Sequence, residues 1–256
     1  MSKAAIGPSA KVCIAIPSGE QWHAAFAMCT TLMILDTMTY PTPGWGGITT
    51  AIRNIRGSML WKQRADLVQG ALDLDCTHLL FVDSDQTFPA NTLRRLLHHK
   101  KPVVACNVAT KQYPSSPTAR KWHNKEPWPV FTTVESTGLE EVWRIGTGIM
   151  MVDLSIIKNI PKPWFKVSWG DEGEQYGEDW WFCQQIEEAG YPIFIDHDLS
   201  KEIGHIGSMT YTHNHIPEDM RLEIEAIMAE GSKEEKGSLL ATATRRLEDK
   251  ALKSSV

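Results

Sequence analysis

The sequence predicts an α/β fold in which a mostly parallel central sheet carries helices on both faces. Short apolar runs alternate along the chain with segments of helical period, which is the pattern of strand–helix–strand units. The runs at 77–82 and 149–152 are apolar over most of their length and indicate strands that are covered on both faces. We therefore expect one domain over residues 1–216, followed by an amphipathic helical extension over 217–256.

The individual elements follow from apolar periodicity and from the positions of proline and glycine. Strands are expected at 11–17, 48–55, 77–82, 102–106, 130–133, 142–145, 149–152 and 193–195. Helices are expected at 21–38, 60–72, 90–100 and 178–189, and one or two more in the extension. We expect 130–133 to pair with 142–145, and we expect 107–129, which has four prolines and no clear period, to be a long loop. The glycine-rich segment 168–177 is also expected to be a loop.

Composition excludes several classes of protein. With 42% hydrophobic and 22% charged residues the chain resembles an ordinary globular protein, and no apolar run approaches the roughly 20 residues of a membrane helix. The N-terminus lacks a basic stretch followed by an apolar segment, so we expect a cytoplasmic protein with no membrane partner. The five cysteines show no Cys-x-x-Cys spacing, which argues against a disulfide framework and a zinc knuckle.

Positive charge is concentrated in one stretch of an otherwise acidic chain. Residues 94–125 contain eight Lys or Arg and no Asp or Glu, although the formal net charge is −5. Such a stretch either faces a polyanion or forms a solvated helix face and loop. Aromatic residues lie among these cations, as in surfaces that bind nucleic acids or sugars. The predicted acceptor surface consists of Arg120, Lys121, Trp122, Lys125 and, further along the chain, Trp169.

The segment Asp83-Ser84-Asp85 follows the buried strand at 77–82 directly. Ligands of open α/β sheets bind beyond the carboxyl ends of the strands, so two carboxylates separated by one residue there can face one cation. Carboxylate oxygens suit Mg²⁺ or Mn²⁺, which in turn bind phosphate oxygens. The alternative is that one of the aspartates only caps the helix that follows.

Several ordered motifs over residues 11–212 resemble the GT-A glycosyltransferases, whose fold is Rossmann-like, and in particular compact family-two-like and phage-type members. The motifs are Ile16-Pro17-Ser18-Gly19, Arg64, Leu79 to Asp85, Gly146-Thr147-Gly148, Gly177-Glu178-Asp179 and Gly204-His205-Ile206-Gly207. The resemblance implies a hexosyl- or pentosyltransferase that uses a UDP- or GDP-linked sugar as donor. It implies donor contacts by Pro17, Ser18, Glu20, Arg64, Asp83, Ser84, Asp85, Gly146, Thr147 and Gly148.

The resemblance also implies a metal site and a catalytic base. Asp83, Asp85 and His205 would hold Mn²⁺ or Mg²⁺. Alternatively, His205 is a structural histidine that is hydrogen-bonded to a loop. Asp179, with Glu178 beside it, would remove a proton from the acceptor hydroxyl, and the transfer would then invert the anomeric configuration. Both residues would otherwise only cap the helix at 178–189.

The acceptor and the overall activity leave alternatives open. The basic, aromatic stretch favours a hydroxymethylated base in DNA, reached by flipping the nucleotide. A sugar-nucleotide pyrophosphorylase has a related sheet, but the glycine-rich phosphate signature expected after the first strand is absent. A non-catalytic nucleotide- or DNA-binding module is the other alternative. The helices of the extension could pack on the body or join two chains into an oligomer.

Overall fold

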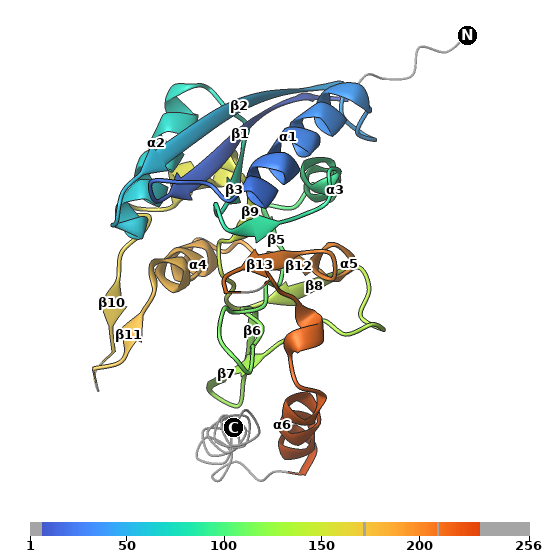
Figure 1. Ribbon diagram of the computed structural model, residues 1–256. Coiled ribbons are helices and arrows are strands. Elements are labelled where there is room, and N and C mark those ends of the chain that lie inside the picture. Colours follow the sequence, from blue (N-terminus) through green and yellow to red (C-terminus); the bar gives the residue numbers. More distant parts are fainter. Residues whose placement is uncertain (1–6, 171–172, 209, 231–256) are drawn as a thin grey trace.

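The computed structural model describes residues 7–170, 173–208 and 210–230, and a seven-stranded sheet lies at its centre (Figure 1). The sheet has the order β2 (Gly47–Arg56), β1 (Ser9–Ser18), β3 (His78–Val82), β9 (Ile149–Asp153), β5 (Val103–Ala105), β12 (Ile193–Asp196) and β8 (Leu139–Val142). Strands β2, β1, β3, β5 and β12 run in one direction, and β9 and β8 run in the other. The predicted α/β class with a mostly parallel sheet is confirmed.

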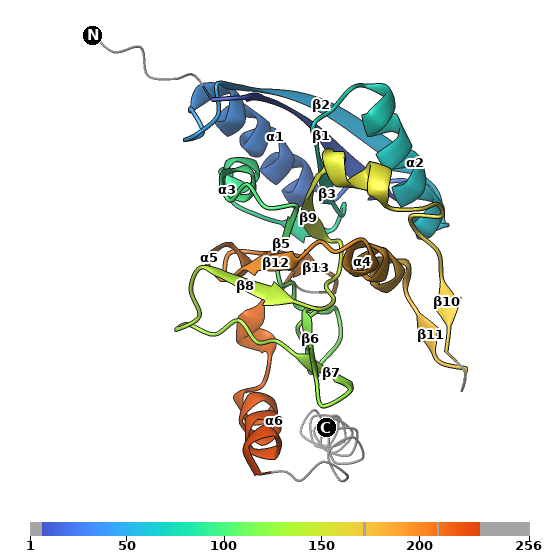
Figure 2. The ribbon, with the colours of Figure 1, turned by 180° about the vertical axis from the view of Figure 1, so that it is seen from behind.

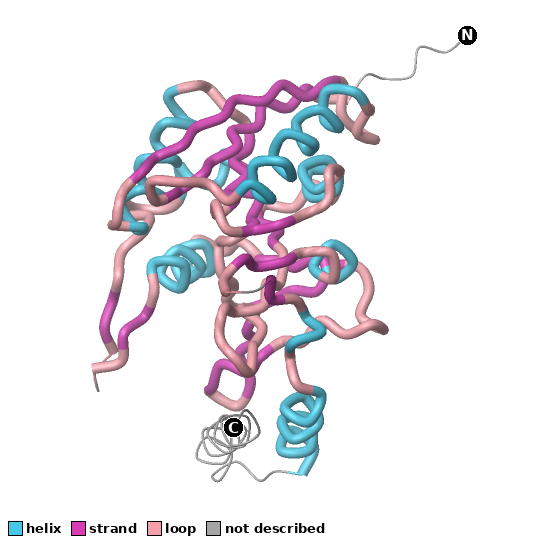
Figure 3. Tube along the Cα trace, in the orientation of Figure 1, coloured by secondary structure: helices cyan, strands magenta, loops and turns pink. Residues whose placement is uncertain are grey.

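Helices cover both faces of this sheet, as Figures 1 and 2 show from opposite sides. One face packs against α2 (Leu60–Asp73) and α4 (Glu178–Glu188), and the other against α1 (Ala24–Thr39), α3 (Thr92–His98) and α5 (His197–Ser200). Successive side chains of β1 alternate between the two cores: Cys13 and Ala15 join the first, whereas Val12, Ile14 and Ile16 join the second. In Figure 3 the strands of the central sheet, in magenta, accordingly lie between helices, in cyan.

Two predictions about the middle of the chain are wrong. Residues 130–133 form no strand, because the Val130 carbonyl accepts a hydrogen bond from the Asn107 side chain (2.7 Å) instead of from a neighbouring strand. The segment 107–129 is also no plain loop, since β6 (Arg120–His123) and β7 (Glu126–Pro129) form a hairpin within it. Asn124 and Lys125, with φ of 50° and 69°, adopt the left-handed conformation that a two-residue hairpin turn requires.

Short strands that the sequence did not predict bring distant segments together. A small sheet consists of β4 (Gln86–Thr87), β13 (Gly204–Ile206) and β14 (Thr210–Tyr211). It returns the chain after α5 to the carboxyl end of β3. Within the predicted loop 168–177, β10 (Ser168–Trp169) pairs with β11 (Gln175–Tyr176), and this hairpin projects beside α4 (Figure 2). The chain also contains two 3₁₀ helices, Leu154–Asn159 and His213–His215.

The extension begins with α6 (Glu218–Glu230), which packs on the body of the protein. Its side chains Met220 and Ile224 are buried against Trp128 of β7. The second helix expected in the extension lies outside the described residues. In the part of the chain that the structure describes, no helix is long and apolar enough to cross a membrane.

Candidate active site

A buried arginine lies where four segments meet at the carboxyl end of β3. Arg64 of α2 is only 3% exposed, and its Nη2 lies 3.1 Å from both carboxylate oxygens of Asp83. Its Nε lies 3.2 Å from Oε1 of Glu178 at the start of α4. Its Nη1 contacts the hydroxyl of Thr147 and lies 3.3 Å from the carbonyl oxygen of that residue. Arg64 therefore connects α2, the end of β3, the turn at 146–148 and α4.

Burial and neighbouring charges shift the pKa values of Arg64 and Asp179. Burial would lower the pKa of Arg64, but the charges of Asp83, Glu178 and Asp179 outweigh it and raise that pKa. Burial also raises the pKa of Asp179 to about 6; Glu178 raises it as well, and Arg64 opposes the rise. A carboxyl group with a pKa near neutrality can accept a proton at physiological pH, as a general base must.

The Gly146-Thr147-Gly148 turn lies between the two carboxylates. The Asp83 amide donates to the Gly148 carbonyl at 2.9 Å. A Cβ atom at Gly148 would lie 3.7 Å from Oδ2 of Asp83, and one at Gly146 would lie 3.7 Å from Oδ2 of Asp179. The structure thus brings Arg64, this turn, Asp83 and the Glu178-Asp179 pair together as the sequence motifs implied.

A groove of about 250 Å³ opens beside Asp83 at the ends of β1 and β3. It is lined by Pro17, Ser18, Gly19, Gly57, Ser58, Leu60, Gln63, Asp83, Ser84 and Asp85. Gln63 was missed by the sequence analysis; its side-chain amide donates to the carbonyls of Ser18 and Ile55, both at 2.8 Å, and fixes the groove wall. Glu20 does not line this groove and instead pairs with the exposed Arg56 at 3.4 Å.

Asp85 and His205 are neighbours because of the pairing of β4 with β13. His205 is opposite Gln86 in this pairing, and the Ile206 amide donates to the Asp85 carbonyl at 2.7 Å. Nε2 of His205 consequently lies 3.5 Å from Oδ1 of Asp85. Burial alone would raise the pKa of Asp85, but His205 and Lys111 outweigh it and lower that pKa to about 2.

The donor atoms of Asp85 and His205 fit a divalent cation. His205 Nδ1 lies 2.9 Å from the Ala109 carbonyl, which can only accept, so Nδ1 donates. In the neutral ring Nε2 then carries a lone pair close to a carboxylate oxygen, an arrangement that a cation between them stabilises. Carboxylate and imidazole together suit Mn²⁺ better than Mg²⁺.

The third predicted ligand, Asp83, does not join this pair. Its carboxylate is bonded to Arg64. Among the described residues, no three His, Cys, Asp or Glu side chains form a group that could hold one metal ion. The residues present therefore offer a two-ligand site, and the role of Asp83 as a ligand stays a prediction.

An aromatic cleft of about 360 Å³ lies beside the first turns of α4, where Trp180, the residue that follows Asp179 in the sequence, is part of its wall. Trp143 lies between Trp122 and Trp180, with ring centroids 4.5 Å and 5.5 Å away. Trp180 also stacks on Tyr176 at 5.5 Å. Trp143, Tyr176 and Trp180 were not among the predicted site residues. Trp143 directly follows β8, whereas Tyr176 belongs to β11 and Trp180 to α4, and nothing in the sequence shows that these segments meet. We call this pocket, with Trp122, Lys125, Trp143, Tyr176 and Trp180 in its wall, the aromatic cleft.

The predicted acceptor residues divide between this cleft and other places. Trp122 and Lys125 line it. Arg120 faces inward: its guanidinium donates to the carbonyls of Pro117 and Ala119, and burial lowers its pKa to about 10. Lys121 pairs with Glu140 at 2.6 Å, and Trp169 is exposed on the β10–β11 hairpin.

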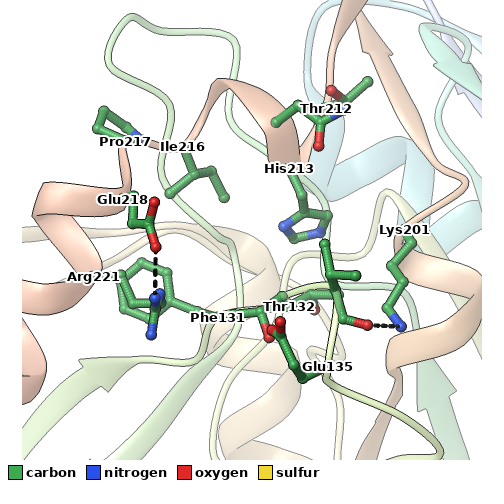
Figure 4. Close-up of a pocket in the computed structure, with 13 residues that line it drawn as sticks. Phe131, Thr132, Glu135, Lys201, Thr212, His213, Ile216, Pro217, Glu218 and Arg221 are labelled. Atoms are coloured by element: carbon green, nitrogen blue, oxygen red, sulfur yellow. Dashed lines mark hydrogen bonds and ion pairs between the residues drawn. The ribbon is translucent and has the colours of Figure 1, made fainter.

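A further cavity, of about 630 Å³, lies between the body and α6 (Figure 4). Its lining includes none of the predicted donor, metal or base residues. Figure 4 shows polar groups of the lining that already have protein partners, such as Glu218 with Arg221 at 3.2 Å and Lys201 with the Val134 carbonyl at 3.0 Å. This cavity therefore adds nothing to the site at the end of β3.

Comparison with known proteins supports the fold. No protein-family model matches the sequence, and no curated protein shows a significant match to it. Among solved structures, the chain is similar to A197 from STIV, with 15% sequence identity and a TM-score of 0.51 over 77% of this chain and 86% of that chain. It also matches TarS 1-349 from S. aureus in complex with UDP-GlcNAc, with 14% identity and a TM-score of 0.42 over 93% and 72% of the two chains, which is too weak a likeness to support an argument. These observations establish the α/β fold alone.

Replacement of Arg64 by methionine tests the electrostatic role of this residue. Arg64→Met removes the buried counter-ion of the partly buried carboxylates Asp83 and Glu178, so we expect the free energy of unfolding at pH 8 to fall by about 3 kcal/mol in urea titrations. Arg56→Met is the matched control, because Arg56 and Glu20 form an exposed pair with 64% and 85% of their side chains accessible. That change should cost less than about 1 kcal/mol. Equal losses of unfolding free energy in the two variants would contradict the role of Arg64 as the counter-ion of these carboxylates.

The raised pKa of Asp179 predicts a particular dependence of stability on pH. The folded protein binds this proton more tightly than the unfolded chain, so the stabilisation is present below the ordinary pKa of 3.8 and is lost as the pH rises through about 6. Relative to Asp179→Asn, the wild type should lose about 2–3 kcal/mol of unfolding free energy between pH 4 and pH 7. Urea titrations at a series of pH values measure this difference, and parallel curves would refute it.

Proposed function

We propose that this chain is a glycosyltransferase that moves a sugar from a nucleotide-diphospho-sugar to a hydroxyl acceptor. The observation that carries the proposal is the arrangement around Arg64, where Asp83 borders the groove at the end of β3 and Asp179 directly precedes Trp180, a wall residue of the aromatic cleft. In this proposal the first carboxylate serves the donor, and the second, whose pKa is raised, serves the acceptor. The finer proposal, from the sequence motifs, is a family-two-like GT-A enzyme of the compact phage type.

The donor would occupy the groove lined by Pro17, Ser18 and Asp83–Asp85. Its UDP or GDP moiety would lie along Pro17 and Ser18, with Asp83 near the ribose and the diphosphate towards Asp85. A Mn²⁺ or Mg²⁺ ion held by Asp85 and His205 would neutralise charge on the diphosphate leaving group. Gly146 and Gly148 would let the transferred sugar lie close to the backbone.

Asp179 would act as the base on the acceptor. It would take the proton of the acceptor hydroxyl while that oxygen attacks the anomeric carbon of the donor, and the nucleoside diphosphate would leave from the opposite side. A single displacement of this kind inverts the anomeric configuration. Glu178 would help to position Arg64, which in turn holds Asp83 and limits the rise in the pKa of Asp179.

The aromatic cleft supports an acceptor that carries its hydroxyl on or near a ring. Rings stack on tryptophan faces, and this holds for the bases of nucleic acids and for sugars. A hydroxymethylated base in DNA is such an acceptor. Of the three predicted cations only Lys125 lines the cleft, so DNA would be held by stacking more than by phosphate contacts.

Two variants separate donor binding from turnover. We expect a nucleotide sugar of the UDP or GDP series to raise the melting temperature in the presence of Mn²⁺, and Asp85→Ala to abolish this shift. Asp179→Asn should keep the shift but lower the rate of nucleoside diphosphate release about 10²–10⁴-fold, since the base is lost. Asp66→Ala, which removes an exposed carboxylate paired with Lys62, is the control for both assays.

Other outcomes would favour the alternative functions. Full turnover by Asp179→Asn would remove this residue from the mechanism. Nucleotide binding without any release of the sugar would indicate a binding module, and a requirement for a nucleoside triphosphate would indicate a pyrophosphorylase. The oligomer through the extension stays a prediction, because the buried side chains of α6 pack against Trp128 of the same chain.

A further inference from the structure

The ammonium group of Lys111 lies against the carboxylate of Asp85, which is one of the two ligands proposed for the metal ion. Its Nζ lies 2.5 Å from Oδ2 of Asp85, while the other oxygen, Oδ1, lies 3.5 Å from Nε2 of His205. The Asp85 side chain is 26% exposed and the Lys111 side chain 42%, so both can be reached from solvent. The two oxygens of one carboxylate therefore face two different partners.

The segment that carries Lys111 is held in place by its own hydrogen bonds. The Thr110 amide donates to the Ser116 carbonyl at 2.9 Å, and the buried Ser115 hydroxyl lies 3.1 Å from the Thr110 carbonyl and 2.9 Å from the Gln112 carbonyl. These bonds close residues 110–116 into a compact turn. The position of Lys111 beside Asp85 is therefore a property of the turn and not of a long, freely moving segment.

The same segment also holds His205 and passes close to Gly207. Ala109, two residues before Lys111, accepts the hydrogen bond of His205 Nδ1 at 2.9 Å. A Cβ atom at Gly207 would lie 3.4 Å from Cδ of Lys111, which is van der Waals contact, so the lysine stem packs beside this glycine. Residues 109–111 thus contact both members of the Asp85–His205 pair.

A divalent cation and this ammonium group are unfavourable neighbours. An ion bound between Asp85 Oδ1 and His205 Nε2 would lie within a few ångströms of Lys111 Nζ, where like charges repel even in water. In turn, a metal ion stabilises the Asp85 carboxylate less while the ammonium group of Lys111 already neutralises its charge. Entry of the metal therefore requires the lysine to leave, and its long flexible side chain allows this.

We propose that Lys111 and a divalent cation are alternative partners of Asp85, so that Lys111 sets the affinity of the site for the metal. This inference rests on the proposed function in that it uses the metal site of that function. In the free protein Lys111 keeps Asp85 neutralised; when the metal enters, the ammonium is released towards the groove at the end of β3, where the donor diphosphate would lie.

Calorimetric titration of the full chain with Mn²⁺ alone tests this proposal without any turnover. Lys111→Gln removes the competing charge, so we expect the dissociation constant for Mn²⁺ to fall about tenfold. Lys111→Arg keeps the charge and should stay within about twofold of the wild type. Lys158→Gln, a change at an exposed lysine of the first 3₁₀ helix, is the control and should leave the affinity unchanged.

The outcomes separate this proposal from the proposed function. The same Mn²⁺ affinity in Lys111→Gln and in the wild type would overturn the competition, and so would an absence of Mn²⁺ binding in both proteins. If Lys111→Gln binds Mn²⁺ more tightly but no nucleotide sugar binds the wild type, the competition stands and the proposed function fails. If a nucleotide sugar binds and is turned over while the Mn²⁺ affinities are equal, only the role of Lys111 fails.

Discussion

The buried guanidinium of Arg64 is the interaction on which the arrangement of the site depends. Its contacts join α2, the end of β3, the turn at 146–148 and the start of α4, which are far apart in the sequence. One buried cation faces three carboxylates, so the charges do not balance. Burial and, after it, the charge of Glu178 raise the pKa of Asp179, and the excess of carboxylates favours additional positive charge at the site. That charge is provided nearby by Lys111 and, in the proposed enzyme, by a metal ion.

Much of the fold and the centre of the site could be predicted from the sequence because local patterns determine them. The apolar strand at His78–Val82 delivers Asp83 and Asp85 to the sheet edge, and the strand–helix alternation fixes the parallel part of the sheet. The Gly146-Thr147-Gly148 turn and Glu178-Asp179 then meet Arg64, as the order of the motifs implied. In each case the signal lies within a few consecutive residues.

The features of the structure that the sequence did not predict depend on contacts between distant segments. The 130–133 run has strand composition, but the Asn107 side chain takes its hydrogen bond. The aromatic cleft combines Trp122, Trp143 and Trp180 from three separate segments, and no periodicity relates them. The contact between Asp83 and Arg64 is another example, because Arg64 lies on a helix nineteen residues earlier in the chain. Lys111 reaches Asp85 only because a hydrogen-bonded turn brings it there.

The central claim is that Arg64 and the carboxylates around it form one electrostatic unit in which Asp179 is prepared to act as a base. The titration of the Asp179 carboxyl carbon by ¹³C NMR tests this claim most directly. A pKa near 6 in the wild type, and a higher one in Arg64→Met where the opposing positive charge is gone, are the results that the structure predicts. An Asp179 that titrates near its ordinary value of 3.8 and is unaffected by loss of Arg64 would contradict the account.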